Sequence, residues 1–570
     1  MVTAPSPELV RGVQQDVGVR VAVVPTPEGG AGFQELTEDG RPVGGPCLED
    51  LVAGVRRREL AHAPRWVWAN TMELYPRLLA AGVRVERCHD VELTEALLMG
   101  HAGRWGDPRG VLAAWARMTG GPVPADRPPR SRDTQPTLFE AEQETESLDV
   151  LVAVHAEQRR RMGSAEHPAR FGMLVAAESA GALAAAEMGH NGLPWRADVH
   201  SALLTELLGP RQTHGLPPQR LGELSERIAE ALGDRRLRPD SPAEVLRAFA
   251  RAGIRLPSTR SWVLKEVDHP AVPLLLEYKE LYRIYTAHGW SWLASWVRDG
   301  RFRPEYVPGG VVSGRWATRG GGALQIHRTV RRAAIADPGW VLVVADAGQL
   351  EPRILAALSA DERLALASRD GDLYRALADE AFEGDRARAK IGMLAALYGQ
   401  TSGEAPALVA ALRKQFPRAV DYVERAAQVG ESGGLVRSWL GRTCPPATSS
   451  VASLDPEPAE DAPGTSAASH RARGRFTRNF VVQASAADWA LALLATLRTG
   501  LTALGSPAHR PELVFFQHDE VIVHCRAQDA DAVVALVEHA AVRAGHLVFG
   551  ATPVRFPLDV TAVQCYADAK

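Results

Sequence analysis

The sequence predicts a multidomain protein that combines α/β and α+β units. Its 570 residues are enough for about three or four domains with large cores. Up to about residue 195, short apolar runs alternate with helical patterns, whereas residues 196–310 show the spacing of long amphipathic helices. From residue 311 onward glycine and arginine become frequent, and strand patterns again alternate with helical ones.

Composition argues against a membrane-spanning protein and against a secreted one. The hydrophobic fraction, 46%, is ordinary for a globular chain, and no run of about 18 apolar residues predicts a membrane span. The first residues lack the basic-then-apolar layout of a secretory signal. The five cysteines are scattered without metal-binding spacing, which favours free thiols in a reducing compartment. We therefore expect a cytoplasmic protein with no membrane partner.

The net charge is −3 and the pI about 6.6, but the basic residues are clustered. Between residues 301 and 336, seven arginines accompany a single acid, Glu305. A second cluster, between residues 471 and 478, has four arginines and no acid. Such patches in an acidic chain suit contact with phosphates, although solvated helix faces explain either cluster about as well.

The first 195 residues predict an α/β unit. Strands are expected at Val19–Pro25 and Val83–Arg87, and helices at 66–79, 91–99, 147–162 and 173–188. Pro122–Pro136 is polar and proline-rich, as in a loop or linker. In the helical stretch that follows, Ser241 and Pro242 mark a helix start, and residues 272–292 form one long helix. No catalytic grouping lies there, so we expect a helical hairpin that grips a partner.

A buried strand and a hairpin carry the carboxylates on which the functional prediction depends. The apolar run Trp340–Asp346 stops on an aspartate, and in Leu513–Cys525 two strand-like runs flank a polar turn. That hairpin holds Asp519 and Glu520 at the mouth of a sheet, where adjacent carboxylates require a cation. An isolated strand-ending aspartate is more often structural. Together, however, Asp346 and Asp519 predict a site for two magnesium ions and nucleotidyl transfer.

Two further patterns accompany the carboxylates. After Asp346, Gly348 permits a tight turn and Pro352 lies in the first turn of a helix. Arg386, Lys390, Leu394 and Tyr398 recur every four residues, so they form one slowly turning stripe on a helix. Its two cations can clamp a triphosphate, and its tyrosine can present a ring to a base. Alone, such a cation pair is usually a solvated helix face.

In this order and spacing, the segments resemble motifs A, B and C of family A DNA polymerases, the DNA polymerase I or Klenow-like type. Asp346–Arg353 (DAGQLEPR) is similar to D-Y-S-Q-I-E-L-R, Arg386–Gly399 to R-x3-K-x3-F-x3-Y-G, and His518–Glu520 to the end of V-H-D-E. Three further segments are similar to motifs of the same family. Ser313–Arg315 is similar to T-G-R, Ala323–Gln325 to N-L-Q, and Arg475–Asp488 to R-x3-N-x3-Q-G-x-A-A-D. With several motifs in register, chance agreement is very improbable.

The resemblance covers residues 196–570 and implies a right-hand polymerase. Its thumb would be 196–310, its palm 311–362 with motif A, its fingers 363–430 with motif B, and its palm again 431–570 with motif C. The second palm segment contains a stretch rich in Pro, Ser, Ala and acid, at about 444–470, which predicts a disordered insertion.

The resemblance also implies roles for individual residues. The metal ligands would be Asp346, Asp519 and Ala347, holding two Mg²⁺ ions for which Mn²⁺ is a possible substitute; Glu520 and Lys390 complete the catalytic set. Arg386 and Lys390 would contact the phosphates of the incoming deoxynucleoside triphosphate, and Glu351 would be the steric gate against a ribose 2′-hydroxyl. The other residues at this nucleotide would be Gln349, Leu394 and Tyr398. Primer-template DNA would contact Arg315, Gln325, Arg475, Asn479, Gln483 and His518.

The sequence departs from the family pattern at three places. Leu394 replaces the aromatic residue that the family sets against the nucleotide sugar, which puts sugar packing and dideoxynucleotide discrimination in question. Ala347-Gly348 stand where the family has Tyr-Ser, and Gln400-Thr401 where it often has Met-Ser. None of these changes removes a carboxylate or a phosphate clamp, so we expect an active DNA-templated DNA polymerase of replication or repair.

Residues 1–195 resemble a degenerate, ribonuclease H-like 3′–5′ exonuclease domain. Asn70–Glu73 is similar to part of the second exonuclease motif and His89–Val91 to a following segment, yet Glu28 is the sole acid near the first strand. We therefore expect no proofreading, and we expect no 5′–3′ nuclease domain. Two alternatives stay open: an enzyme like the single-subunit RNA polymerases, and a catalytically silent DNA-binding protein.

Overall fold

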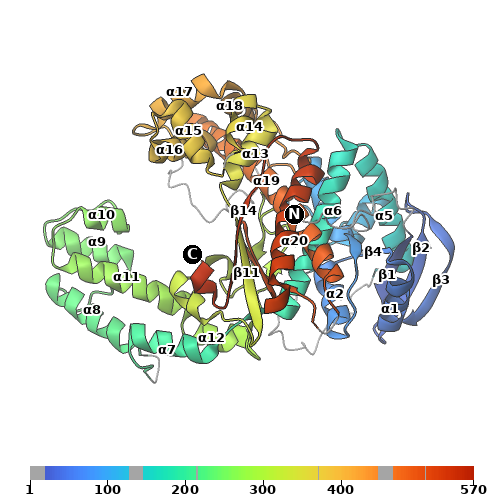
Figure 1. The fold of residues 1–570 in the computed structure, drawn as a ribbon, viewed down its shortest axis with the longest axis horizontal. Coiled ribbons are helices and arrows are strands. Elements are labelled where there is room, and N and C mark those ends of the chain that lie inside the picture. Colours follow the sequence, from blue (N-terminus) through green and yellow to red (C-terminus); the bar gives the residue numbers. More distant parts are fainter. Residues whose placement is uncertain are drawn as a thin grey trace, which may run out of the picture.

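A central body carries two helical arms in the computed structural model of the protein (Figure 1). The structure describes residues 19–127, 146–212, 216–369, 371–446, 466–506 and 509–569. One arm consists of α7 to α12 and lies at the lower left of the sheet that contains β11 and β14, and the other consists of α13 to α18 and lies above that sheet (Figure 1). The N-terminal strands lie at the opposite side of the molecule, beyond α6 and α20.

The N-terminal unit is built on a mixed five-stranded sheet in the order β3-β2-β1-β4-β5. Strand β1 runs antiparallel to β2 and parallel to β4; β2 and β3 are antiparallel, and β4 and β5 are parallel. The strands are β1 (Arg20–Pro25), β2 (Gly30–Leu36), β3 (Pro42–Asp50), β4 (Arg65–Trp68) and β5 (Arg87–Asp90). The helices are α1 (Leu51–His62), α2 (Thr71–Ala80), α3 (Val91–His101), α4 (Val111–Thr119), α5 (Leu148–Gly163) and α6 (Pro168–Asn191).

Two predictions for this unit were wrong in part. The helix expected at 66–79 is strand β4 followed by α2, because Asn70 caps the helix and its side chain accepts a hydrogen bond from the Met72 amide. The strand expected at 83–87 is β5, three to four residues later. The strand at 19–25 and the helices at 91–99, 147–162 and 173–188 are confirmed by β1, α3, α5 and α6. Much of the predicted loop Pro122–Pro136 lies outside the described residues.

The first arm is helical, as predicted for the segment after the α/β unit. Ser241 is an N-cap whose hydroxyl accepts from the Glu244 amide at 3.4 Å. The single helix expected at 272–292 is instead two helices, which separate at Gly289. The helices are α7 (Ala197–Leu208), α8 (Gln219–Ala231), α9 (Pro242–Arg251), α10 (Ser261–Lys265), α11 (Ala271–His288) and α12 (Trp290–Trp296).

Short strands lead from this arm to the central sheet. They are β6 (Leu193–Pro194), β7 (Val297–Arg298), β8 (Arg301–Phe302), β9 (Tyr306–Val307) and β10 (Ala317–Thr318). The central sheet is antiparallel, in the order β12-β13-β11-β14. Its strands are β11 (Trp340–Ala347), β12 (Glu512–Gln517), β13 (Glu520–Arg526) and β14 (Leu558–Val563), and α20 (Ala530–Phe549) connects the last two.

The second arm begins directly after β11. Its helices are α13 (Leu350–Ser359), α14 (Glu362–Ala367), α15 (Leu373–Ala381), α16 (Arg386–Tyr398), α17 (Ala405–Gln415) and α18 (Pro417–Glu431). Helix α19 (Ser466–Ala503) then returns to the body. The predicted insertion at 444–470 was wrong at both ends, because Cys444 is fully buried and α19 begins at Ser466. Its middle, 447–465, lies outside the described residues.

Among the described residues, three helices are long and apolar enough to cross a membrane, judged by length and composition alone. They are Pro168–Asn191, Ser469–Ala503 and Ala527–Phe549. The most apolar window is 78% buried within the protein in the first, 83% in the second and 39% in the third. Packing in the core therefore accounts for most of the apolar surface of α6 and α19. The expectation that the chain has no membrane partner stays a prediction.

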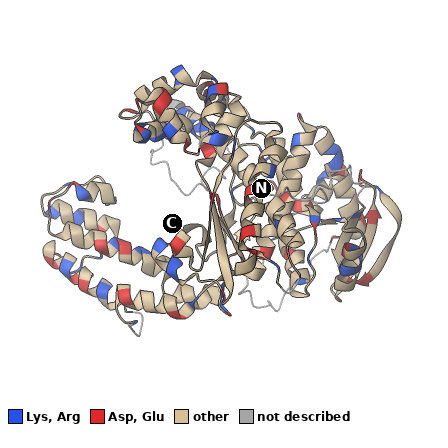
Figure 2. Cartoon of the chain, viewed as in Figure 1, with Lys and Arg blue, Asp and Glu red and all other residues tan. Residues whose placement is uncertain are grey.

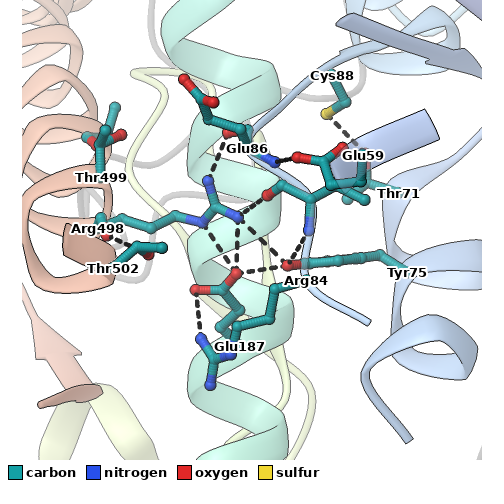
Figure 3. Close-up of polar contacts among 12 residues, drawn as sticks. Glu59, Thr71, Tyr75, Arg84, Glu86, Cys88, Glu187, Arg498, Thr499 and Thr502 are labelled. Carbon is teal, nitrogen blue, oxygen red and sulfur yellow. Dashed lines mark hydrogen bonds and ion pairs between the residues drawn. The ribbon is translucent and has the colours of Figure 1, made fainter. Parts of the chain in front are cut away.

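A buried polar network joins the N-terminal unit to the rest of the body (Figure 3). Arg498 on α19 donates to Glu187 of α6 at 2.7 and 3.0 Å, and Tyr75 of α2 donates to the same carboxylate at 2.5 Å. Arg498 also donates to the carbonyl oxygen of Glu86 at 2.7 Å. Burial alone would raise the pKa of Glu187, but the charges of Arg498 and Arg84 outweigh it and lower that pKa. Three segments distant in sequence are thus fixed at one point.

Candidate active site

The predicted carboxylates meet at one edge of the central sheet. In the antiparallel register of β11 and β13, Asp346 stands opposite Glu520. Strands β12 and β13 are joined by a two-residue turn, His518-Asp519, in which His518 has a φ of 58°. The Ala347 amide donates to the backbone oxygen of Asp519 at 3.2 Å. Residues 173 positions apart in the chain are therefore neighbours.

The charges of the two aspartates affect each other. Burial and then the charge of Asp346 raise the pKa of Asp519 to about 6. Two facing carboxylates with hard oxygen donors suit Mg²⁺. Nowhere in the described ranges do three or more His, Cys, Asp or Glu side chains gather as a metal site. A metal ion here would take its further ligands from backbone, substrate or water.

Glu520 points to different partners. It is buried, it accepts a hydrogen bond from the hydroxyl of Tyr566, and Arg331 lies 3.9 Å from the same oxygen. Tyr566 and Arg331 stack as a cation–π pair with the guanidinium 4.5 Å from the ring centroid. These contacts fit an accessory role beside the aspartate pair better than direct contact with substrate.

The turn after β11 differs from the prediction. Gln349, not Gly348, takes the left-handed conformation, with a φ of 58°. Its side chain compensates by donating to Asp372 at 2.7 Å and accepting from the Leu373 amide at 2.7 Å. Pro352 lies in the first turn of α13, as predicted. A strained residue is thus held in place by two hydrogen bonds to the next helices of the arm.

Glu351 connects three of the predicted site residues. Its carboxylate accepts from Arg315 at 2.8 Å and from the Tyr398 hydroxyl at 3.1 Å. Arg315 lies between β9 and β10, Glu351 is in the first turn of α13 and Tyr398 ends α16, so the contact links the body with the second arm. This position suits a side chain that closes one wall of a nucleotide site.

Of the two cations in the predicted stripe on α16, one is already engaged in an ion pair within the protein. Arg386 forms an ion pair with Asp372 at 2.6 Å, so its guanidinium must leave Asp372 to bind a phosphate. Lys390 is exposed and forms no ion pair with any residue that the structure describes. Lys and Arg residues occur along both arms (Figure 2). Leu394, one turn further on, is half-buried and lines a cavity.

These elements surround a cavity of about 340 Å³. Predicted residues that line it come from five separate segments of the chain. They are Arg315, Gln349, Glu351, Leu394, Gln483, His518 and Asp519. The cavity thus contains the hairpin carboxylate, the proposed gate and the leucine that replaces an aromatic residue, within one space of the size of a small-molecule site.

Residues 216–564, more than half of the chain, match the model of DNA polymerase family A. The chain belongs to this family. It is 28% identical to the thermostable DNA polymerase I of Thermus filiformis over 322 residues (51% of this chain and 35% of that protein). It is 26% identical to that of Thermus aquaticus over 335 residues (53% and 37%). The chain spans about a third of the length of the curated relatives it matches.

A solved structure shows the same family A fold. The POL domain of Pol1 from M. smegmatis, in complex with DNA primer-template and dNTP, superimposes with a TM-score of 0.70 at 17% identity. The match covers 96% of this chain and 96% of that chain. It therefore includes the N-terminal unit, which lies outside the part that matches the family model.

Three of the residues expected at DNA in this family A chain do not line the cavity. Gln325 is exposed in a short 3-10 helix, Ala323–Gln325. Arg475 and Asn479 lie on α19, and Arg475 packs beneath Gly399, where an added Cβ would lie 3.0 Å from its Cγ. The Asn479 side-chain oxygen is buried without a hydrogen-bond partner among the described residues. Only Arg315, Gln483 and His518 line the cavity itself.

Sequence reasoning missed two residues of the site. Tyr374 lines the cavity next to Leu394, and Asp372 holds both Gln349 and Arg386. Both lie in the sequence Asp372-Leu373-Tyr374 at the start of α15, where the aspartate is the N-cap. The N-cap pattern was readable from the sequence, but its approach to α16 depends on the folding of the arm.

A buried ion-pair network supports the turn that carries Arg315. Arg442 donates to Asp488 at 3.0 Å and to Glu178 of α6 at 2.6 Å, and all three side chains are at most 4% exposed. Its guanidinium lies under Gly314, where an added Cβ would come 2.4 Å from the Arg442 Cζ atom. Gly314 also has a φ of 84°. Glycine is therefore required there for both space and backbone conformation.

Proposed function

We propose that this chain is a DNA-directed DNA polymerase that adds deoxynucleotides to the 3′-hydroxyl of a primer. The observation that carries the proposal is the meeting of Asp346 and Asp519 at one sheet edge, beside a cavity that contains Glu351. Family membership supports the reaction class. The M. smegmatis Pol1 domain is a complex with DNA primer-template and dNTP, which supports the same two ligands here.

Asp346 and Asp519 are the residues that fit divalent metal ions, which we propose to be two Mg²⁺ ions replaceable by Mn²⁺. The raised pKa of Asp519 reflects burial beside another carboxylate, a situation that a bound cation relieves. Bound ions would neutralise charge on the transferring phosphate and make the primer hydroxyl more acidic. Ala347, whose amide donates to the Asp519 backbone, holds the two acidic positions together.

The remaining residues bind and orient the substrates. Lys390 is available for the incoming phosphates, and Arg386 joins it once it exchanges Asp372 for phosphate. Glu351, held by Arg315 and Tyr398, forms the wall against which a ribose 2′-hydroxyl would press. Exclusion at that wall would favour deoxynucleotides.

Primer extension with Mg²⁺ tests the proposal. Asp346→Asn and Asp519→Asn should each lower the extension rate by about 100-fold or more, since each removes a charge that stabilises the reacting phosphate. Asp559→Asn is the matched control, because Asp559 stands opposite Asp346 on β14, the other neighbouring strand, and is exposed. Full extension by either site variant, or an equal loss in the control, would refute the metal-site assignment.

The same assay separates the alternatives. Extension with ribonucleotides as efficient as with deoxynucleotides would indicate an RNA polymerase-like enzyme. Tight binding of primer-template DNA without any extension would indicate a silent DNA-binding protein. The proposal further places the enzyme in replication or repair as a cytoplasmic, nucleoid-associated monomer; sedimentation of the purified chain would check the last point.

We also propose that the N-terminal unit is a degenerate ribonuclease H-like exonuclease domain without proofreading, and that the arms α7–α12 and α13–α18 are thumb and fingers. The mixed sheet with β2 as an antiparallel strand supports the first assignment. Strand β1, with the sequence RVAVVP, carries no carboxylate. A primer with a mismatched 3′ end should stay intact in Mg²⁺ without nucleotides; its shortening would refute the idea.

A further inference from the structure

One carboxylate, that of Asp372, contacts both segments on which nucleotide binding would depend. Its Oδ1 atom accepts from the Gln349 side-chain amide at 2.7 Å, and its Oδ2 atom accepts from Arg386 Nε at 2.6 Å. Gln349 is the N-cap of α13, two residues before Glu351, and Arg386 is the first residue of α16, which also carries Lys390. Asp372 therefore connects the proposed sugar gate with the proposed phosphate clamp.

The backbone around Asp372 is fixed against α13. The Leu373 amide donates to the side-chain oxygen of Gln349 at 2.7 Å. Arg353 of α13, which is 1% exposed, donates to the carbonyl oxygen of Gly371 at 2.9 Å, directly before Asp372. These hydrogen bonds join the start of α15 to the start of α13 without the help of any residue of α16.

Arg386 is the partner of Asp372 that can leave. The side chains of Arg386 and Asp372 are 50% and 41% exposed, and an ion pair this exposed adds little stability. The Arg386 guanidinium lies 5.8 Å from the ring centroid of Tyr374, which lines the cavity, and the exposed Lys390 is one helical turn away. Triphosphate oxygens carry more charge than one carboxylate and match the guanidinium fork, so a triphosphate bound here would take Arg386 from Asp372.

We propose that Asp372 is a positioning residue that couples triphosphate binding to selection of the sugar; this inference rests on the nucleotide site of the proposed function. In the free protein, Asp372 shares its negative charge between Arg386 and the Gln349 amide. When a triphosphate takes Arg386, the hydrogen bond from Gln349 becomes stronger, because Arg386 no longer competes for that charge. The turn that leads to Glu351 is then held more firmly while the sugar lies against it.

Two substitutions of Asp372 separate its charge from its hydrogen bond. Asparagine and serine both cap helices, so each can keep the bond from the Arg375 amide that caps α15. Asp372→Asn removes the ion pair but leaves an oxygen for Gln349, whereas the serine hydroxyl of Asp372→Ser lies too close to the backbone to reach it. Asp379→Asn is the matched control, because Asp379 lies on the same helix and forms an exposed ion pair with Arg375 at 3.8 Å.

Calorimetry with tripolyphosphate and the full chain tests the exchange of Arg386. Asp372→Asn and Asp372→Ser should each lower the Kd of tripolyphosphate about threefold, because Arg386 no longer has to leave an ion pair. Asp379→Asn should keep the Kd of the parent. In an Arg386→Gln background, the gain from either substitution should vanish. No binding by the parent, an unaltered Kd in Asp372→Asn, or the same gain without Arg386 would overturn the proposal.

A primer-template that ends in a 2′,3′-dideoxynucleotide then tests the coupling without bond formation. In the parent, the preference for the deoxy sugar should be about fivefold greater between dATP and ATP than between dAMP and AMP, as one hydrogen bond allows. Asp372→Ser should remove this difference, and Asp372→Asn should keep part of it. No difference in the parent, or the parent's difference in Asp372→Ser, would overturn the coupling. The expected binding together with no extension of an unblocked primer would refute the polymerase reaction and leave the coupling supported.

Discussion

Leu394 is the residue at which this chain departs most clearly from its family, and the structure gives it a neighbour. Leu394 and Tyr374 both line the cavity, and Tyr374 is 7% exposed. Leu394→Phe adds an aromatic face worth about 1 kcal/mol, so the KM for deoxynucleotides should fall about fivefold, with altered use of dideoxynucleotides. Steady-state insertion of one nucleotide measures this.

Tyr374→Leu is the companion variant. It should raise the KM in the parent, and the added Leu394→Phe change should reverse part of that rise. An unaltered KM and dideoxynucleotide ratio in Leu394→Phe would mean that Tyr374 already occupies the place of the missing ring.

The carboxyl group of Glu92 should make the stability of the folded protein depend on pH. Burial and then the charge of Asp90 raise its pKa to about 8, and Asn70 donates to it at 2.8 Å. Between its unfolded pKa, 4.5, and about 8, the folded state binds more protons than the unfolded state. The free energy of unfolding should therefore fall as pH rises through this window, by on the order of 3 kcal/mol.

Urea denaturation from pH 5 to about pH 9 tests this contribution. Glu92→Gln should flatten the decline, while Glu28→Gln, at an exposed position in the turn between β1 and β2, should leave the curve as in the parent. A parent-like slope in Glu92→Gln would contradict the assignment.

At the scale of elements, α6 and α19 cross at Gly181. An added Cβ there would lie 2.5 Å from Leu491 Cδ2 and 3.6 Å from Trp316. Gly181→Ala should therefore destabilise the protein by about 1–3 kcal/mol, even though alanine favours a helix. Gly172→Ala, on the same helix with open space around it, should be neutral or slightly stabilising.

A double-mutant cycle checks the cause. Shortening the neighbour in Leu491→Ala removes the clash, so the further change Gly181→Ala should cost little in that background or fill part of the cavity. Equal costs of Gly181→Ala in both backgrounds, measured by chemical denaturation, would show that backbone strain and not the contact with Leu491 is responsible.

Local sequence patterns predicted correctly those elements that depend on interactions between residues close together in the chain. The strand that ends at Asp346, the hairpin around Asp519 and the cap at Ser241 follow from runs and capping residues of a few positions. The two aspartates were predicted to meet because motif order indicated it, and the register of β11 and β13 confirms this.

The predictions were wrong where contacts between residues distant in the chain determine the local structure. The helix expected from Trp66 is a strand because Trp66 and Trp68 are buried in a sheet, and tertiary burial overrides the helical pattern. Gln349 takes a positive φ because Asp372 holds its side chain. Asp372, Tyr374 and Arg442 reach the site only through the folding of the second arm and α19, which no short pattern encodes.

At the scale of the whole molecule, α6 and α19 connect the N-terminal unit with the body that contains the central sheet. Glu178 and Glu187 of α6 bind arginines 442 and 498, one beneath the Arg315 turn and one at the N-terminal unit. The unit proposed to have lost nuclease chemistry is therefore bonded, through α6, to α19, and α19 lines the cavity. This arrangement explains how an N-terminal unit without catalysis can be retained as a support for the polymerase body.

The Arg498 network gives this view a measurable consequence. Arg498→Met leaves Glu187 buried with weaker compensation, which should cost about 3–5 kcal/mol and separate the unfolding of the N-terminal unit from that of the body. Arg498→Met with Glu187→Met replaces the pair by apolar groups and should restore most of the stability and a single transition. Arg160→Met, which breaks an exposed pair with Glu157, should cost under about 1 kcal/mol. Urea denaturation followed by tryptophan fluorescence measures all three; a small effect of Arg498→Met would mean that apolar packing alone joins the two units.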